Sequence, residues 1–248
     1  LFLRNGKPHF AVRRKGKLYV ARGGGDIVGR WSHLAGVLAK DGQLKLYVDG
    51  ELAGTAKAPG AIGSDPNEPM NIGADANSNV ADYRTPYGLY GAVDEVRLYR
   101  GALRAAEVKK HVREPRDADA GASLVLRYTF DEKEVHDRSG HDNDPRLEGT
   151  STVAGKSGGG LQFSGWRGPV VEVANSGSLN PADTAWTAEA WVKATKPDGV
   201  VLGRGGATHG YGLYLENGKP CFAVRREGTL HKLEGPSKVT GRWTHLVG

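Results

Sequence analysis

Carboxylate and amide side chains gather in residues 137–144, and their chemistry is the first to stand out in the sequence. This segment, Asp-Arg-Ser-Gly-His-Asp-Asn-Asp, brings Asp137, Asn143 and Asp144 close together around a glycine. Hard oxygen ligands in a tight loop suit Ca²⁺ better than a transition metal. The alternative is an Asx-turn cluster, in which the side chains hydrogen-bond to their own backbone. Both interpretations are open from the residues alone.

A further carboxylate, Asp94, lies in a strand expected over residues 92–99, Ala-Val-Asp-Glu-Val-Arg-Leu-Tyr. The side-chain period of two places Ala92, Val96 and Leu98 on one face, which must be the buried one, and Asp94 shares that face. A carboxylate among apolar neighbours is costly unless a cation or backbone N–H groups satisfy it. Asp94 is therefore a second candidate metal ligand.

Aromatic and amide side chains between residues 77 and 90 suggest a binding surface. The candidate ligand-binding residues are Asn77, Asn79, Tyr83, Tyr87 and Tyr90. Aromatic rings offer an apolar face with a polar tip, and amides beside them at a loop tip would complete a platform for a sugar. The same aromatic residues would equally serve to pack the loop onto a sheet, and this alternative also stays open.

One segment matches conventional catalytic or phosphate-binding motifs only in part, because the residues and elements around it do not fit. Residues 155–159, Gly-Lys-Ser-Gly-Gly, fit the pattern G-x-S-x-G, but a strand follows them where a nucleophile elbow requires a helix. The same residues lack the first glycine of a phosphate-binding loop, because position 150 is Thr. A glycosidase needs two close carboxylates, and no acidic pair of the E-x-D-x-x-E kind occurs. We therefore predict no catalytic residues and no enzymatic activity.

The elements that must position these residues are strands. The 248 residues include 37 glycines, and Asn-Gly or Asp-Gly pairs at 5–6, 41–42 and 217–218 are strong hairpin signals. Leu124, Leu126, Tyr128 and Phe130 alternate as in a half-buried strand. One short helix is expected on the surface at residues 103–111. The fold class predicted is all-β.

Charge and hydropathy exclude several classes of partner. The 34 basic residues are interleaved with 28 acidic ones to give a net charge of +6, without the basic cluster that is typical of nucleic-acid binding. Weak attraction to anionic polysaccharide is the expected consequence. No segment approaches the roughly 18 apolar residues of a membrane span. The single cysteine, Cys221, allows no intrachain disulfide.

An internal repeat sets the domain organisation. Residues 3–18 recur almost unchanged at 215–230, and residues 29–34 recur at 241–246, both displaced by 212 positions. Residues 1–116 are therefore expected to form the C-terminal half of one unit, 117–122 a linker, and 123–248 the N-terminal half of the next unit. The halves could close as one permuted sandwich or be completed by neighbouring molecules. Self-association through the repeated end segments is expected.

The motifs of both halves resemble one known family, the laminin G-like domains of the concanavalin A-like lectin superfamily. The segments 31–37, 42–50, 71–73 and 91–99 resemble its C-terminal half, and 126–130, 137–140, 161–165, 187–192 and 210–214 resemble its N-terminal half. The resemblance implies a two-sheet antiparallel β-sandwich of the jelly-roll type. It also implies that Asp94 and the loop containing Asp137, Asn143 and Asp144 hold a structural calcium ion.

The function expected from this resemblance is that of a non-catalytic carbohydrate-binding or adhesion module within a larger secreted protein, stabilised by calcium. Its partner would be a polysaccharide or glycoconjugate, with no nucleic acid and no membrane span. The expected location is extracellular, periplasmic or on the cell surface, although no signal peptide opens this chain. The alternative is a structural or assembly repeat with no small ligand.

Overall fold

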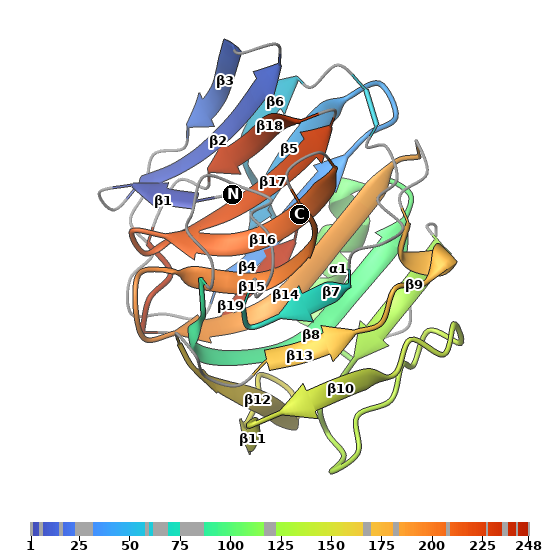
Figure 1. The fold of residues 1–248 in the computed structure, drawn as a ribbon. Coiled ribbons are helices and arrows are strands. Elements are labelled where there is room, and N and C mark those ends of the chain that lie inside the picture. Colours follow the sequence, from blue (N-terminus) through green and yellow to red (C-terminus); the bar gives the residue numbers. More distant parts are fainter. Residues whose placement is uncertain are drawn as a thin grey trace.

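The chain folds as a sandwich of two β-sheets (Figure 1). A computed structural model describes residues 2–4, 7–14, 17–22, 32–57, 60–61, 69–74, 87–116, 123–165, 170–180, 184–206, 209–226, 228–234, 238–241 and 243–247. Strands make up 55% of it and helix 7%, and nearly all strand pairings are antiparallel. The predicted all-β jelly-roll sandwich of the concanavalin A-like type is confirmed.

The first sheet, sheet A, runs in the order β1-β2-β18-β17-β16-β15-β7-β13-β10, and β3 pairs with β2. Its strands are β1 (Phe2–Arg4), β2 (Lys7–Arg14), β3 (Lys17–Arg22), β7 (Met70–Ile72), β10 (Pro145–Glu148), β13 (Val170–Val173), β15 (Gly199–Gly205), β16 (Gly210–Glu216), β17 (Lys219–Arg226) and β18 (Thr229–Glu234). Strands from before and after residues 117–122 thus lie side by side in this sheet.

The second sheet, sheet B, runs in the order β11-β12-β8-β14-β19-β4-β5-β6, and β9 pairs with β8. Its strands are β4 (Ser32–Leu38), β5 (Gln43–Val48), β6 (Glu51–Lys57), β8 (Tyr90–Arg100), β9 (Ser123–Tyr128), β11 (Ser151–Ala154), β12 (Gly159–Ser164), β14 (Trp186–Ala194) and β19 (Trp243–Val247). The two halves of the sequence interleave here as well.

Apolar side chains fill the space between the sheets. Alternating residues of β14, from Trp186 to Ala194, face this core, and so do Leu44 and Leu46 of β5. The period of two that the sequence shows is the reason, since one face of each strand must meet the opposite sheet. A short 3-10 helix (Gly177–Leu179) contributes Leu179 to the same core.

The helix α1 (Ala105–Arg113) covers the outer face of sheet B (Figure 1). It begins with a capping box, because the backbone N–H of Arg104 donates to the Glu107 carboxylate at 2.6 Å. Val108 packs in a second, smaller cluster with Val37, Tyr47, Tyr99 and Leu103. The short surface helix expected near residues 103–111 is therefore present.

Strand β8 departs from the alternation expected for residues 92–99. Val93, Val96 and Leu98 face the main core, whereas Ala92 lines a hollow on the outer surface. The change of face falls at Asp94 and Glu95, where Glu95 takes a left-handed conformation with φ of 48°. The prediction that Ala92, Val96 and Leu98 share one face was wrong because this irregularity shifts the period within the strand.

Candidate functional site

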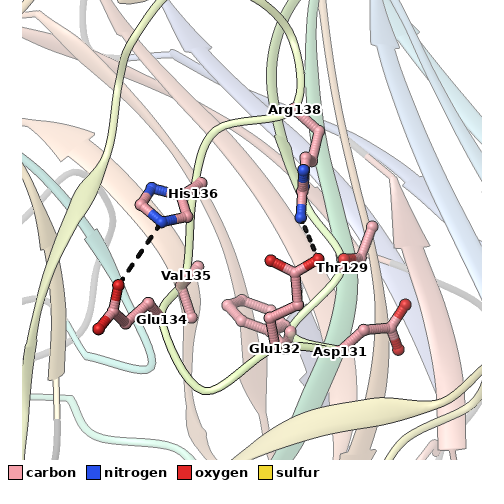
Figure 2. A pocket seen from close by; sticks show the side chains of 8 residues that line it. Thr129, Asp131, Glu132, Glu134, Val135, His136 and Arg138 are labelled. Carbon is pink, nitrogen blue, oxygen red and sulfur yellow. Dashed lines mark hydrogen bonds and ion pairs between the residues drawn. The ribbon is translucent and has the colours of Figure 1, made fainter.

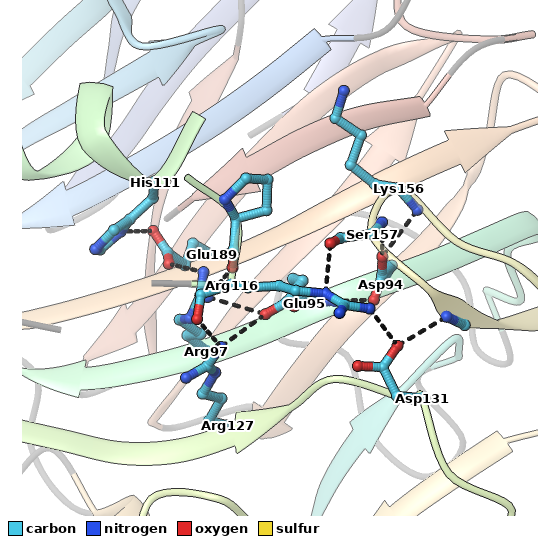
Figure 3. A network of polar contacts seen from close by, with 12 residues as sticks. Asp94, Glu95, Arg97, His111, Arg116, Arg127, Asp131, Lys156, Ser157 and Glu189 are labelled. Atoms are coloured by element: carbon cyan, nitrogen blue, oxygen red, sulfur yellow. Dashed lines mark hydrogen bonds and ion pairs between the residues drawn. The ribbon is translucent and has the colours of Figure 1, made fainter. Parts of the chain in front are cut away.

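Asp94 is held by backbone N–H groups from its own strand and from the turn between β11 and β12 (Figure 3). Its Oδ1 accepts from the Glu95 N–H at 2.7 Å, and its Oδ2 accepts from the N–H groups of Lys156 and Ser157 at 2.8 and 3.0 Å. A Cβ at Gly155 would lie 2.6 Å from Oδ2, so the turn needs glycine there. Residues 155–159, which have no catalytic context in the sequence, thus serve to bind this carboxylate.

Burial dominates the electrostatics of Asp94. The side chain is inaccessible to solvent, and burial raises its pKa to about 7. The three N–H donors favour the charged form, and the neighbouring Glu95 opposes it. A fully buried carboxyl with a raised pKa therefore lies within β8 of sheet B.

Asp137 organises the loop that follows β9. Its Oδ1 accepts from the N–H groups of Arg127 and Ser139, both at 2.9 Å. Its Oδ2 accepts from the Ser139 hydroxyl at 2.8 Å and from the Asn143 N–H at 3.1 Å. Two carboxylate oxygens offer about four acceptor positions, and these four donors fill them.

Asn143 and Asp144 complete the same loop. The Asn143 amide donates to the Val125 carbonyl at 2.9 Å, and its oxygen accepts from the Ser178 hydroxyl at 3.2 Å. Asp144 accepts from the Asp137 N–H at 2.7 Å and meets His136 Nδ1 at 2.9 Å. The bond with His136 lowers the pKa of Asp144 and raises that of His136.

The structure brings Asp137, Asn143 and Asp144 together, but no contact within its described part joins them to Asp94. Within the same part, no group of three His, Cys, Asp or Glu side chains is arranged to hold a metal ion. The donors around Asp137 leave no acceptor position for a cation, and the geometry is that of the Asx-turn alternative. Calcium binding stays a prediction that these donor sets do not favour.

The acidic stretch just before this loop encloses only a small hollow. Figure 2 shows its lining side chains, with the carboxylate of Glu132 turned toward Arg138 and that of Glu134 toward His136. The volume is about 10 Å³, enough for about one water molecule. This hollow therefore has no room for a ligand.

A buried ionic network lies where α1 packs on the outer face of sheet B (Figure 3). The Arg97 guanidinium donates to Glu189 at 3.0 Å and to Glu95 at 2.9 Å, and His111 Nδ1 lies 3.0 Å from the second Glu189 oxygen. Burial by itself would raise the pKa of Glu189, but His111 and Arg97 hold it below its usual range. Burial raises the pKa of Glu95.

Sequence reasoning missed this network, although one signal was available. Glu189 lies between two alanines that face the core, so its side chain points to the outer face of β14. A buried charge on that face requires another element to cover it. The two carboxylates have no exposed area and share Arg97. Their arrangement fixes α1 to the sheet, and a substrate could not reach them.

The predicted ligand-binding residues have different environments. Asn77, Asn79 and Tyr83 lie outside the described residues. The Tyr87 hydroxyl donates to Asp198 at 2.9 Å and its ring meets Tyr214 edge-on, so this residue packs its loop onto sheet A. Tyr90 alone of the five is described with an exposed ring, at 37% exposure.

Tyr90 lies beside a surface hollow on the outer face of sheet B. The hollow has a volume of about 350 Å³ and is lined by Ala92, Val153, Ala154, Gln162, Lys193 and Thr195. Tyr90 shares the face of Ala92 by the period of two, and the Thr195 hydroxyl donates to its carbonyl at 3.1 Å. The ring lies against Gly165, where a Cβ would come within 2.0 Å of it.

A cationic side chain extends this surface along β14. The Lys156 ammonium lies 4.5 Å from the centre of the Trp191 ring, and Trp191 precedes Lys193 by two residues on the same face. Burial lowers the pKa of Lys156. The surface therefore combines an exposed aromatic ring, an amide, a hydroxyl and two ammonium groups.

One of the three comparisons with known proteins gave a match, and it covers the first part of the chain. Residues 1–109 match a laminin G family model described as the concanavalin A-like lectin/glucanases superfamily. The comparison with curated proteins gave no match, and neither did the comparison with solved structures. In the described part of the chain, no helix has the length and apolar character needed to cross a membrane.

Proposed function

Residues 1–109 belong to the concanavalin A-like lectin/glucanase superfamily, and from this premise we propose that the protein is a non-catalytic carbohydrate-binding or adhesion module. The superfamily fits such a role. We place the module in a larger secreted protein, because laminin G-like domains are typically extracellular.

The observation that carries the proposal is the exposed ring of Tyr90 beside the hollow on sheet B. Sugars bind to aromatic faces through their C–H groups, while amides and hydroxyls around the ring fix their orientation. Gln162 and Thr195 supply those polar groups at the wall of the hollow. Tyr90 stays a predicted ligand-binding residue, with Gln162 and Thr195 as its proposed polar partners.

The positive charge around the hollow favours a negatively charged sugar over a neutral one. Lys193 lines the hollow, Lys156 lies nearby, and the chain as a whole carries a net charge of +6. Ammonium groups favour anionic partners, and the attraction weakens as salt is added. The proposed ligand is therefore an acidic polysaccharide or glycoconjugate.

The test is a glycan array followed by calorimetric titration with the best ligand. We expect Tyr90→Ala to weaken binding about tenfold or more, since loss of a central aromatic contact costs about 1.4 kcal/mol or more. Leu52→Ala is the matched control, because Leu52 is also exposed but lies on β6 at the other end of sheet B. Equal affinity of Tyr90→Ala and the unchanged protein would contradict the proposal.

The non-catalytic part of the proposal rests on the buried carboxylates. Laminin G-like domains are usually non-catalytic, although the superfamily includes glucanases. A glycosidase would need two carboxylates within reach of the sugar. Glu95 and Glu189 are fully buried and bound to Arg97, and the hollow beside Tyr90 has no acidic side chain in its lining.

The alternative function, a structural or assembly repeat, draws on the repeated end segments. It predicts self-association without any glycan partner. An array with no binding at any salt concentration, together with association of the chain, would favour it over the proposed function.

A further inference from the structure

Three side-chain positions follow one another along the outer face of sheet B at the end of β14. Trp191, Lys193 and Thr195 share that face, because the residues between them belong to the core and side chains two residues apart on a strand point the same way. Each step is about 7 Å, so the three positions span roughly 13 Å. A glycan that lies along this line therefore needs more than one sugar to cover it.

The end of the line at Thr195 suits an uncharged sugar. The Thr195 N–H donates to the Tyr90 carbonyl at 2.7 Å, which places the exposed Tyr90 beside it. Ala92 has no side chain beyond Cβ, and with Lys193 it lines the hollow of about 350 Å³. This volume lies in the lower part of the range for small-molecule sites, and Tyr90 supplies an aromatic ring at its edge.

Gln162 gives the hollow an oriented hydrogen-bond acceptor. It pairs with Ala92 across β8 and β12 and lines the hollow. Its Nε2 donates to the carbonyls of Gly91 and Phe163, both at 2.9 Å. These two bonds use both hydrogens of the amide, so its oxygen is the atom that serves a ligand. A sugar hydroxyl is a donor that fits this oxygen.

The other end of the line is cationic. The Lys156 ammonium lies 4.5 Å from the centre of the Trp191 ring, and the exposed Lys193 is the next position along the same face. Burial lowers the pKa of Lys156, and the charge of Asp49 acts in the opposite direction. An ammonium that is partly removed from water interacts more strongly with an anion than a fully hydrated one does.

The turn that carries Lys156 is fixed by contacts within the protein. Asp94 accepts from the N–H groups of Lys156 and Ser157 at 2.8 and 3.0 Å, and Arg116 donates to the Ser157 hydroxyl at 2.8 Å. Figure 3 shows these contacts, with the side chain of Lys156 extending away from Asp94. A charged group on a fixed turn loses less conformational freedom on binding than one on a loose loop, so Lys156 is well placed to recognise a ligand.

We propose that this face holds two adjoining subsites for one glycan chain. An uncharged sugar stacks on Tyr90 in the hollow and donates a hydroxyl to Gln162. The anionic group of the next sugar binds between the ammonium groups of Lys193 and Lys156. The ligand class is an oligosaccharide in which an uncharged sugar adjoins an acidic one, and Lys156 and Lys193 set the preference for the acid. This inference rests on the proposed function and adds to it the position of the charge.

Hexasaccharides in which N-acetylhexosamine alternates with a uronic acid are the probes. Calorimetric titration compares the unsulfated form, a sulfated form and the neutral form whose carboxyl groups have been reduced. We expect the protein to bind an acidic form about tenfold more tightly than the neutral one at low salt, and to lose this preference at roughly 1 M salt. Tight binding of the unsulfated form assigns the anionic group as a carboxylate, and tight binding of the sulfated form alone assigns it as a sulfate.

Two substitutions remove the ammonium groups but keep apolar side chains of similar length. Lys156→Met and Lys193→Met should each reduce the preference for the acidic form to about threefold, and the double variant should abolish it with the affinity for the neutral form unchanged. Lys57→Met is the matched control, because it removes the same charge from an exposed side chain on β6, at the other end of sheet B. It should keep the full preference.

Tyr90→Ala separates this inference from the proposed function, because it should weaken binding of the acidic and neutral forms by the same factor. An acid preference that persists in the double variant, or that falls equally in Lys57→Met, would overturn the two subsites and leave a Tyr90-dependent glycan site in place. Unchanged binding of the neutral form by Tyr90→Ala would instead contradict the proposed function. Absence of binding to all three hexasaccharides would exclude the ligand class, and the glycan array would then decide the proposed function separately.

Discussion

At the scale of single residues, Asp94 and Asp137 differ in burial and in the number of donors that bind the carboxylate. Asp94 has three N–H donors and a raised pKa, whereas Asp137 has four donors in a loop open to solvent. The sequence indicated both carboxylates but not their partners. Two of the three donors of Asp94, the N–H groups of Lys156 and Ser157, lie about sixty positions further along the chain, and only the pairing of β8 with β12 brings them near.

The raised pKa of Asp94 predicts a pH dependence. The folded chain holds its proton up to about pH 7 and the unfolded chain only up to pH 3.8, so the carboxyl contributes stability below about pH 4 that is lost as the pH rises through 7. The expected loss is about 4 kcal/mol. Asp94→Asn should remove this dependence, so its free energy of unfolding relative to the unchanged protein should increase between pH 4 and 8.

The measurement is denaturant unfolding across this pH range. Asp142→Asn, an exposed substitution in the loop after β9, serves as the control and should keep the original slope. Parallel curves for Asp94→Asn and the unchanged protein would show that Asp94 is charged throughout.

Asp137 predicts a calcium test. Asp137→Ala leaves its four donors without an acceptor and should lower the free energy of unfolding by roughly 2–3 kcal/mol. Because those donors already fill the carboxylate, we expect the same loss in the presence of Ca²⁺ and of EDTA. The measurement is the melting temperature of the unchanged protein and of Asp137→Ala, each in Ca²⁺ and in EDTA. A calcium-dependent rise that Asp137→Ala abolishes would instead establish the metal site that the family resemblance implies.

At the scale of elements, α1 depends on the buried network beneath it. Sequence alone placed this helix well, because its alanines and its capping residues act locally. Which face it covers could not be predicted, since the carboxylate that His111 meets, Glu189 of β14, is 78 positions away in sequence. The face of Ala92 was mispredicted for a similar reason: an irregularity inside a strand leaves no mark on hydrophobic periodicity.

Glu189→Gln tests the network. It leaves the Arg97 guanidinium buried beside a neutral amide and should lower the free energy of unfolding by about 3–5 kcal/mol. Glu51→Gln is the control, because the exposed Glu51–Lys109 ion pair also joins α1 to the sheet and should contribute less than about 1 kcal/mol. Urea unfolding measures both. Similar losses for the two variants would mean that burial adds nothing to the pairing.

At the scale of the whole molecule, the sandwich draws its strands from both ends of the sequence. The all-β class and the sandwich could be predicted from turn spacing, alternation and family motifs. The proposed binding surface could be predicted only in part, because Tyr90 was singled out by its residue type, whereas Gln162, Lys193 and Thr195 come near it only through strand pairing. The type of a residue indicates what it can bind, but its neighbours on a sheet depend on the register of the strand pairs.

The interleaving of the two halves has a consequence for the chain after a cut. Strands from before and after residues 117–122 are neighbours in both sheets, so each fragment of a chain cleaved between the halves is paired with strands of the other. The two fragments are therefore expected to stay associated under native conditions and to separate only when the sandwich unfolds.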